Sequence, residues 1–390
     1  MIRSTVAHVD LSALQANFKA IQAFLADGAG AARGAATRQN PPRIIAVVKA
    51  NGYGHGAEPV AFALQAAGAD LLACADIEEG IALRRAGVRV PILVFGALSV
   101  SDLSGLFEFG LTPTISSPAA ARAVQAAAAR HDTSIGYHLK IDTGMNRLGF
   151  RYDNLRRTLP ELLASPNLRL EAIFTHFGTA DDAELPFFNE QRERFERALQ
   201  TIPPLRAGDA GGRSPLIHAA NSAATLRDSR VWYDMVRPGL LLYGIVPPPL
   251  ATTIPLTPVM SLTSRVVAVK GVRPGEGVGY GLRFRAETHV TTAVIPAGYA
   301  DGIDMRVSGK CQVLIRGRRA PIVGSVSMDM MTVDVTDLEG VSPGDEVVII
   351  GRQGDEPWQQ IDAREVAAAI GTIPYEIVCR IGARIERRYI

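Results

Sequence analysis

Between residues 44 and 237 the chain alternates short apolar runs with stretches of helical periodicity, and this alternation constrains the fold most strongly. Near-continuous apolar strands separated by helices are typical of a parallel sheet that is covered on both faces. Eight such units in about 200–250 residues predict a (β/α)8 barrel of the TIM type. The apolar runs are IIAVV (44–48), LLACA (71–75), PILVF (91–95), LTPTI (111–115), YHLKI (137–141), LEAIF (170–174), PLIHA (215–219) and MVR (235–237).

The segment before the first run predicts one more helix and a loop. Asp10 is a good N-cap, and apolar residues recur at spacings of three and four up to Leu25, so residues 10–25 are expected to form an amphipathic helix. Residues 27–42 are rich in alanine and glycine and contain almost no large apolar side chain. We therefore expect a surface loop there.

The texture of the sequence changes near residue 250. The proline-rich stretch VPPPLATTIPLTP is typical of a linker, and β-type runs such as VTTAVIPAG and DEVVIIG follow it, separated by turn signals. One helical pattern, IDAREVAAAIG, comes late in this part. The predicted fold class is α/β, with the barrel in residues 1–250 and a mainly β domain in residues 251–390.

Charge and composition exclude several classes of function. The 390 residues include 41 basic and 39 acidic side chains, which gives no electrostatic footprint for nucleic acid or an anionic membrane. The start, MIRSTVAHVDLS, lacks the apolar core of a secretory signal, and no apolar window approaches the about 20 residues of a membrane span. Cys74, Cys311 and Cys379 are scattered, which argues against disulfides and a zinc site. A cytoplasmic protein without a metal is expected.

Polar side chains gather where the predicted strands end. In a (β/α)8 barrel the active residues lie at the C-terminal ends of the strands. Any one of these side chains alone is more simply explained as a structural hydrogen-bonder, but together on one rim they favour a functional site. The residues at these ends are Lys49, Tyr53, Lys140, Arg147, His176, Asn221, Ser222 and Arg237.

The last two loops of the predicted barrel suggest a phosphate site. NSAAT after the seventh strand and PGLLLYG after the eighth are each expected to begin a helix, and Gly239 allows close backbone approach. Barrels often bind phosphate at this place. The alternative is that Asn221 or Ser222 is only a helix cap.

The stretch KANGYGHG raises the question of why a lysine ends the first strand. Lys49 is either a surface cap or a reactive amine. An exposed lysine has a pKa of about 10.4 and is a poor nucleophile at neutral pH. Burial lowers that pKa, and an amine beside a phosphate site could hold a phosphate-bearing aldehyde covalently. Pyridoxal phosphate (PLP) is such a cofactor.

KANGYGHG also resembles the PLP-lysine signature of the alanine racemases. HLKIDTGMNRLG, THFGTAD, HAANSAA, VRPGLLLYG, GVGYG, GYADG, VSMDM and IPYE have counterparts in the same order, so the resemblance covers nearly the whole chain. It implies a PLP-dependent isomerase that interconverts L- and D-alanine by two-base transfer of the α-proton and supplies D-alanine for peptidoglycan. It also implies a head-to-tail homodimer with shared active sites.

The resemblance assigns the two bases. Lys49 would bind the cofactor covalently and act as one base. Tyr280, in GVGYG of the second domain, would be the opposite base and would reach the cofactor of the partner subunit. Considered alone, GVGYG is instead a plain hairpin turn with Tyr280 packed on its own domain.

Further roles are implied by the same resemblance. Arg237, supported by His176, would meet the pyridine nitrogen and discourage its protonation, and Arg147 would contact the phenolic oxygen of the cofactor and the substrate carboxylate. Lys140 matches a lysine that is often carbamylated in the family and then steadies Arg147. The cofactor phosphate would be held by Tyr53, Ser222, Gly239 and Tyr375, with Asn221 beside them. The substrate side would be shaped by Met328, Asp329 and, at the entrance, Tyr299.

One departure from the family pattern concerns the lysine loop. Gly52 stands where the family usually has alanine, which should loosen the loop slightly without affecting the chemistry.

Three alternative functions remain at this point. A PLP-dependent decarboxylase shares the architecture, but its acidic motifs for a basic substrate are not seen here. A racemase of wider specificity, accepting serine or lysine, would differ in the size of its site. A non-catalytic PLP carrier would need only the barrel.

Overall fold

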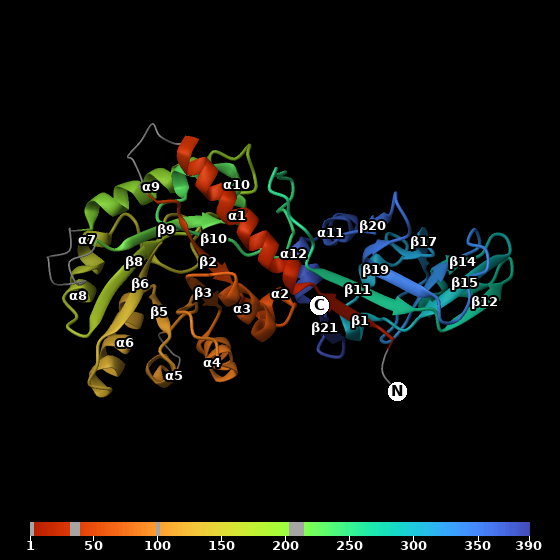
Figure 1. Ribbon diagram of the computed structural model, residues 1–390, viewed down its shortest axis with the longest axis horizontal. Helices are drawn as coiled ribbons and strands as arrows, with labels where there is room; N and C mark the ends of the chain where they lie inside the picture. The colour runs from red at the N-terminus through yellow and green to blue at the C-terminus, as the bar shows by residue number, and fades with distance from the viewer. Residues whose placement is uncertain (1–3, 32–39, 99–101, 203–213) are drawn as a thin grey trace.

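The computed structural model describes residues 4–31, 40–98, 102–202 and 214–390. Two units lie along the long axis of the molecule, a barrel on one side and a strand-rich unit on the other (Figure 1). Within the described residues, no helix is both long enough and apolar enough to cross a lipid bilayer.

The first unit is a closed parallel barrel. Its strands follow the order β5-β4-β3-β2-β10-β9-β8-β6, and pairing of β5 with β6 closes the ring. Each predicted apolar run forms one of these strands, so the prediction of a TIM-type barrel is confirmed. The strands are β2 (Arg43–Val47), β3 (Leu71–Cys74), β4 (Ile92–Val94), β5 (Thr112–Ile115), β6 (Ile135–Asp142), β8 (Leu168–Phe174), β9 (Leu216–Asn221) and β10 (Met235–Arg237).

Helices connect and surround these strands (Figure 1). Capping residues fix where several of them begin: Asp76 accepts a hydrogen bond from the Glu79 amide, and Ser117 accepts one from the Ala120 amide. The helices of the barrel are α3 (Ala57–Ala66), α4 (Ile77–Ala86), α5 (Ser104–Glu108), α6 (Pro118–Arg130), α7 (Leu155–Thr158), α8 (Pro160–Leu163), α9 (Phe187–Thr201) and α10 (Ser222–Arg227).

Helix α1 (Leu11–Ala31) is longer than expected. Asp10 caps it through a 2.8 Å hydrogen bond from the Ala13 amide, as predicted. The expectation of a loop over residues 27–42 is wrong for residues 27–31, which continue the helix. Alanine is the best helix former, so an Ala-rich stretch can extend a helix without an apolar stripe. Residues 32–39 of the expected loop lie outside the described part of the chain.

The second unit is built around a long, mainly antiparallel sheet with the order β12-β15-β18-β17-β16-β19-β11-β1-β21. The expected β-rich character of this part of the chain is confirmed. Its elements are β11 (Met260–Arg265), β12 (Ala268–Val272), β13 (Gly277–Val278), β14 (Phe284–Arg285), β15 (Val290–Ile295), β16 (Gln312–Ile315), β17 (Arg318–Val323), β18 (Met331–Asp334), β19 (Glu346–Gln353), β20 (Gln359–Ile361), α11 (Ala363–Ile370), α12 (Pro374–Cys379) and β21 (Glu386–Tyr389).

Strand β1 (Val6–Val9) belongs to this second sheet although it precedes the barrel in the sequence. It pairs antiparallel with β11, where Val6 faces Thr263, and parallel with β21, where Val6 faces Glu386. A division of the chain at residue 250 does not separate the two sheets completely, because the chain starts in one unit, builds the barrel and then returns.

The segment after β10 differs from expectation. PGLLLYG does not form a helix but a series of turns, with hydrogen bonds from the Leu242 amide to the Gly239 carbonyl and from the Gly244 amide to the Leu241 carbonyl. Gly244 then adopts φ +74°, and a side chain there would lie 1.9 Å from the Thr257 carbonyl oxygen. This left-handed residue ends the turns before a helix can propagate.

Candidate active site

Lys49 lies at the end of β2, at the start of a left-handed turn, α2 (Lys49–Tyr53). Ala50, Asn51 and Gly52 all have φ and ψ between 44° and 61°. This conformation costs non-glycine residues roughly 1–2 kcal/mol each, so neighbouring groups must hold it in place. The turn fixes the positions of Lys49 and Tyr53 at the barrel rim.

Glu79 anchors the start of this turn, a role that the sequence analysis did not assign. Its carboxylate accepts hydrogen bonds from the Ala50 amide (2.7 Å) and the Ala75 amide (2.7 Å), and so joins the loops that follow β2 and β3. The only signal in the sequence is a glutamate in the first turn of a helix, which is common in any helix.

The amine of Lys49 lies near two arginines. Burial is the main cause that lowers its pKa, and the charges of Arg147 and, to the smallest extent, Arg237 also lower it, while Cys379 and Glu79 act in the opposite direction. Burial also lowers the pKa of Lys140 to about 8, again with Arg147 and Arg237 contributing. These cations surround one spot and partly repel each other, so the site favours an anionic ligand.

Arg237 is 3% exposed and its guanidinium is held by the barrel interior. It donates to His218 Nδ1 (2.8 Å), to the carbonyl oxygens of Thr175 (2.8 Å) and Ala219 (2.9 Å), and to His176 Nδ1 (3.3 Å). The expected support of Arg237 by His176 is therefore present in the geometry. Burial, followed by the charge of Arg237, keeps the pKa of His176 well below its usual range, so this imidazole is neutral.

Two histidines behind Arg237 extend the hydrogen-bond chain. Because a guanidinium can only donate, His218 accepts through Nδ1 and carries its proton on Nε2, which donates to His138 Nδ1 at 3.0 Å. Burial is the main cause that lowers the pKa of both rings, that of His138 to about 3. Neither histidine was predicted as a site residue, although each is a polar residue inside an apolar strand.

The expected phosphate cradle lies between the loops after β9 and β10. Ser222 Oγ accepts hydrogen bonds from the Gly239 amide (3.0 Å) and the Leu241 amide (3.4 Å), which leaves its own proton free for a ligand. A Cβ on Gly239 would lie 2.3 Å from the Tyr53 hydroxyl oxygen, so this close approach requires glycine. Asn221 acts as the N-cap of α10 through the Ala224 amide (2.9 Å), as its alternative reading proposed.

Tyr53 and Tyr375 meet beside this cradle, with ring centroids 5.8 Å apart. Burial raises the pKa of Tyr53 and raises that of Tyr375 to about 12, so both phenols keep their protons and can donate to an anion.

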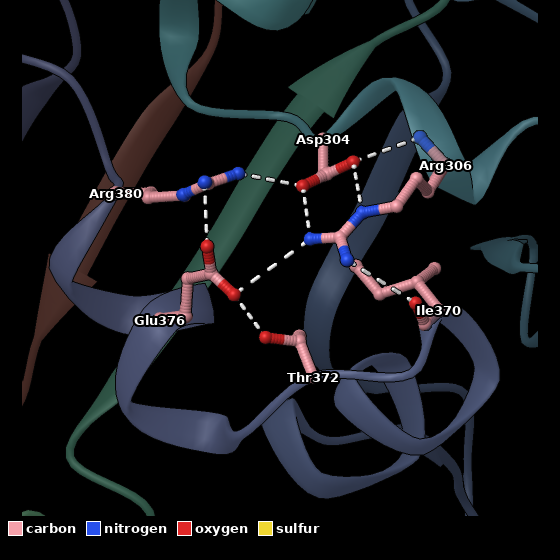
Figure 2. A network of polar contacts seen from close by, with 6 residues as sticks. All are labelled: Asp304, Arg306, Ile370, Thr372, Glu376 and Arg380. Carbon is pink, nitrogen blue, oxygen red and sulfur yellow. Dashed lines mark hydrogen bonds and ion pairs between the residues drawn. The ribbon is translucent and has the colours of Figure 1, made fainter.

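Helix α12, which carries Tyr375, is fastened by a network of charged side chains (Figure 2). Asp304 accepts from Arg306 Nε (2.9 Å) and from Arg380 Nη1 (2.6 Å), and Glu376 pairs with Arg380 at 2.5 Å. These contacts join α12 to the short helix η4 (Met305–Val307), which follows the Tyr299 loop. None of the charged members was singled out from the sequence, where they resemble ordinary surface charges.

The second-domain residues form a separate group. Strands β13 and β14 pair antiparallel, so GVGYG does lie at a hairpin, as the alternative proposed. Tyr280 begins the 3-10 turn η2 (Tyr280–Leu282) within this hairpin and is 77% exposed, so it does not pack on its own domain. Figure 1 shows β14 at the end of the second unit, remote from α2, which carries Lys49. Within one chain, Tyr280 and Lys49 are therefore not brought together.

Tyr299, Met328 and Asp329 lie on two loops that touch. The amides of Tyr299 and Ala300 donate to the carbonyl oxygens of Ser327 and Met328, both at 3.0 Å. Tyr299 and Met328 are exposed, and Asp329 pairs with Arg384 at 2.6 Å. The structure thus groups these three residues at one exposed surface.

Comparison with known proteins agrees with this arrangement. Residues 9–247 match the model of the alanine racemase N-terminal domain, and residues 259–389 match that of the C-terminal domain. The chain belongs to the alanine racemase family. It is 41% identical over 389 residues to the alanine racemase of Symbiobacterium thermophilum, covering 100% of this chain and 97% of that protein.

Solved structures of alanine racemases show the same fold. The enzyme from Streptomyces lavendulae matches with a TM-score of 0.88 and 34% identity, covering 100% of this chain and 98% of that one. The alanine racemase of Bartonella henselae, solved with covalently bound pyridoxal phosphate, matches with a TM-score of 0.83 and 29% identity, covering 99% of each chain.

The residues present fit PLP, the cofactor of the alanine racemase family. The Ser222 hydroxyl can donate to a phosphate that approaches Gly239, the cationic cluster of Lys49, Arg147 and Arg237 favours an anion, and the Lys49 amine can bond to an aldehyde.

Proposed function

We propose that this chain racemises alanine with PLP and thereby supplies D-alanine for peptidoglycan. The observation that carries the proposal is that the turn from Lys49 to Tyr53 brings the Tyr53 hydroxyl against Gly239, whose amide donates to Ser222, at one barrel rim. When bound, PLP would supply an electron sink that makes the Cα proton of its bound amino acid acidic.

The side chains at the rim hold and orient the cofactor. Ser222, Tyr53 and Tyr375 would donate hydrogen bonds to its phosphate, Gly239 would let the phosphate approach the backbone closely, and Asn221 would fix the helix start beside them. Arg237 would face the pyridine nitrogen. Because the Arg237 guanidinium carries a positive charge and its histidine partners only accept its hydrogen bonds, protonation of that nitrogen would be disfavoured.

Lys49 and Arg147 act on the other side. Arg147 would bind the substrate carboxylate and the phenolic oxygen of the cofactor. The lowered pKa of Lys49 lets this amine accept the Cα proton on one face of the substrate.

The second base must approach from the opposite face, and we assign it to Tyr280 of a second copy of the chain. The exposure of Tyr280 and its distance from Lys49 within one chain support a homodimer with shared sites. Met328, Asp329 and Tyr299, grouped in the same unit, would then complete the substrate side and its entrance.

Lys140 is proposed to carry a carbamate. Its amine is buried beside Arg147 and has a pKa of about 8, so a neutral fraction is available to react with carbon dioxide. The carbamate would replace a positive charge by a negative one and steady Arg147.

The division into a barrel and a second domain near residue 250 is supported by the interval between the two family models, residues 247–259. A cytoplasmic location suits an enzyme that supplies a precursor of peptidoglycan.

The test is to incubate the pure protein with L-alanine in heavy water. We expect D-alanine to form with deuterium at Cα, and borohydride to abolish this activity by fixing the cofactor to Lys49, as a peptide mass would show. Lys49→Ala is the control, and racemisation by this variant at the wild-type rate would overturn the proposal. Serine and lysine, tested in parallel, distinguish a racemase of wider specificity.

A further inference from the structure

His55 lies inside the KANGYGHG motif, yet the proposed chemistry gives it no role. It is 0% exposed and lies two residues after Tyr53. We propose that His55 is a positioning residue that holds the left-handed turn between Lys49 and Gly54 in shape. The link to the cofactor rests on the proposed function, but the effect on the turn does not.

The hydrogen bonds of His55 fix its tautomer. Nδ1 lies 2.9 Å from the Tyr53 carbonyl oxygen and 3.1 Å from the Gly52 carbonyl oxygen. A carbonyl oxygen can only accept, so Nδ1 carries the proton and shares it between the two. Nε2 has no hydrogen-bond partner among the described residues, which agrees with a neutral ring that keeps no proton there.

The bonded carbonyls are those of the strained segment. Tyr53 and Gly52 have φ of +52° and +61°, and the next carbonyl, that of Gly54, accepts from Arg387 Nε at 2.8 Å. Every carbonyl from residue 52 to residue 54 therefore accepts from a side chain. A left-handed turn persists only where its surroundings over-determine it, and His55 supplies two of these restraints.

The His55 ring also connects the turn to the barrel. It packs on Tyr243 with ring centroids 4.5 Å apart, and Tyr243 in turn packs on Tyr53 at 4.9 Å. The Tyr243 hydroxyl donates to the Val47 carbonyl oxygen, two residues before Lys49. Loss of the His55 hydrogen bonds would free the turn and displace the Tyr53 hydroxyl from the phosphate cradle.

The test compares His55→Asn with His55→Gln. The Asn amide can place an N–H where Nδ1–H lies, whereas the longer Gln places its donor near the position of Nε2, so Gln is a control of similar size that lacks the bonds. Hydrogen–deuterium exchange of the protein freed of PLP reports on the turn, and titration with PLP reports on the site.

We expect the amides of residues 50–56 to lose protection about tenfold or more in His55→Gln, with a similar rise in the Kd for PLP, and to stay near wild type in His55→Asn. Unchanged exchange in His55→Gln would overturn the proposal, and so would equal losses in both variants. Faster exchange with unchanged PLP affinity would keep the role in the turn and count against the proposed function of Tyr53.

A measurement on the wild-type protein covers the case in which the variants do not fold. In protein labelled with 15N-histidine, one neutral imidazole should show the Nδ1–H tautomer, in contrast to the Nε2–H form expected for His176, His218 and His138. A spectrum without any Nδ1–H tautomer would refute the assignment.

Discussion

Gly239 lies at the most crowded point of the expected phosphate cradle. Its Cα lies so close to the Tyr53 hydroxyl that a methyl group at this position would overlap with the phenol. Its amide also donates one of the two hydrogen bonds that Ser222 Oγ accepts. The phenol sits on a turn that is itself restrained, so it cannot retreat freely. The cradle therefore depends on the absence of a side chain at this position.

We predict that Gly239→Ala raises the Kd for PLP at least about tenfold, because the new methyl group pushes the Tyr53 hydroxyl away from the phosphate. Fluorescence or absorbance titration with PLP measures this effect. Gly271→Ala, on β12 with open space around the added carbon, is the matched control and should bind PLP as the wild type does. Equal affinities for all three proteins would contradict the role of Gly239.

Gly52 shows where a sequence pattern gives incomplete information. The resemblance suggested that glycine in place of the usual alanine loosens the loop. In the structure this residue has φ +61°, a conformation that glycine adopts without steric cost. Glycine in place of alanine therefore relieves strain in the turn as well as removing a methyl group. This effect on strain follows from the backbone conformation and was not evident from the sequence.

At the level of elements, α12 is fastened through one carboxylate. Asp304 receives hydrogen bonds from two arginines, Arg306 and Arg380. The hydrogen bond from the Arg306 side chain is the main cause that lowers its pKa to about 2, and the charge of Arg380 adds to this effect. Figure 2 shows this network at α12. Since α12 also carries Tyr375, the network would position this proposed phosphate ligand.

Asp304→Asn should therefore weaken PLP binding several-fold and lower the free energy of unfolding by about 1–2 kcal/mol, because charge-assisted hydrogen bonds are lost. Denaturant melts and PLP titration measure the two effects. Asp345→Asn, which breaks a similar pair with Arg316 elsewhere in the second unit, should reduce stability without changing PLP affinity. A loss of PLP affinity in both variants would show that the effect is general destabilisation.

The elements differ in how far the sequence predicts them. The barrel strands were predictable because burial on both faces makes each strand an unbroken apolar run, and the rim residues followed from where those runs end. Helix α1 was underestimated because alanine continues a helix without periodicity. Side-chain contacts between distant segments were not predictable, because no local pattern records them. They include the hydrogen-bond chain through His218 and His138 and the hydrogen bonds of Glu79 and Asp304.

For the whole molecule, buried neutral histidines predict sensitivity to acid. Burial lowers the pKa of His55 to about 4 and of His138 to about 3, and it also lowers those of His176 and His218. With an unfolded pKa of about 6.5, each unfolded ring binds a proton that the folded ring rejects, so stability is full above pH 6.5 and falls as the pH drops towards 4.

The free energy of unfolding should thus decrease by up to about 2 kcal/mol per buried histidine between pH 7.5 and 5. Urea melts of the protein without PLP at several pH values measure this slope. Most carboxylates titrate below this interval, so they contribute little to it. Stability that is independent of pH over this range would contradict the neutral state of these rings.

The proposed sharing of sites between two copies predicts complementation. Mixed dimers of Lys49→Ala and Tyr280→Ala contain one site with both bases and one with neither. Equal random mixing should restore about a quarter of the wild-type activity, because half of the dimers are mixed and each has one intact site. Activity assays after refolding of the two inactive variants together measure this. Failure of the mixture to regain activity would indicate that Tyr280 acts within its own chain or not at all.

The placement of β1 between β11 and β21 has a consequence for dividing this protein. If the chain were cut in the proline-rich stretch, the first fragment would carry β1 without its partner strands. The second fragment would carry β11 and β21 without the strand that lies between them. Each fragment would present bare backbone donors and acceptors, which promote aggregation when alone. Co-produced halves would instead recognise each other through that missing strand, so the chain lends itself to a split protein rather than to two independent modules.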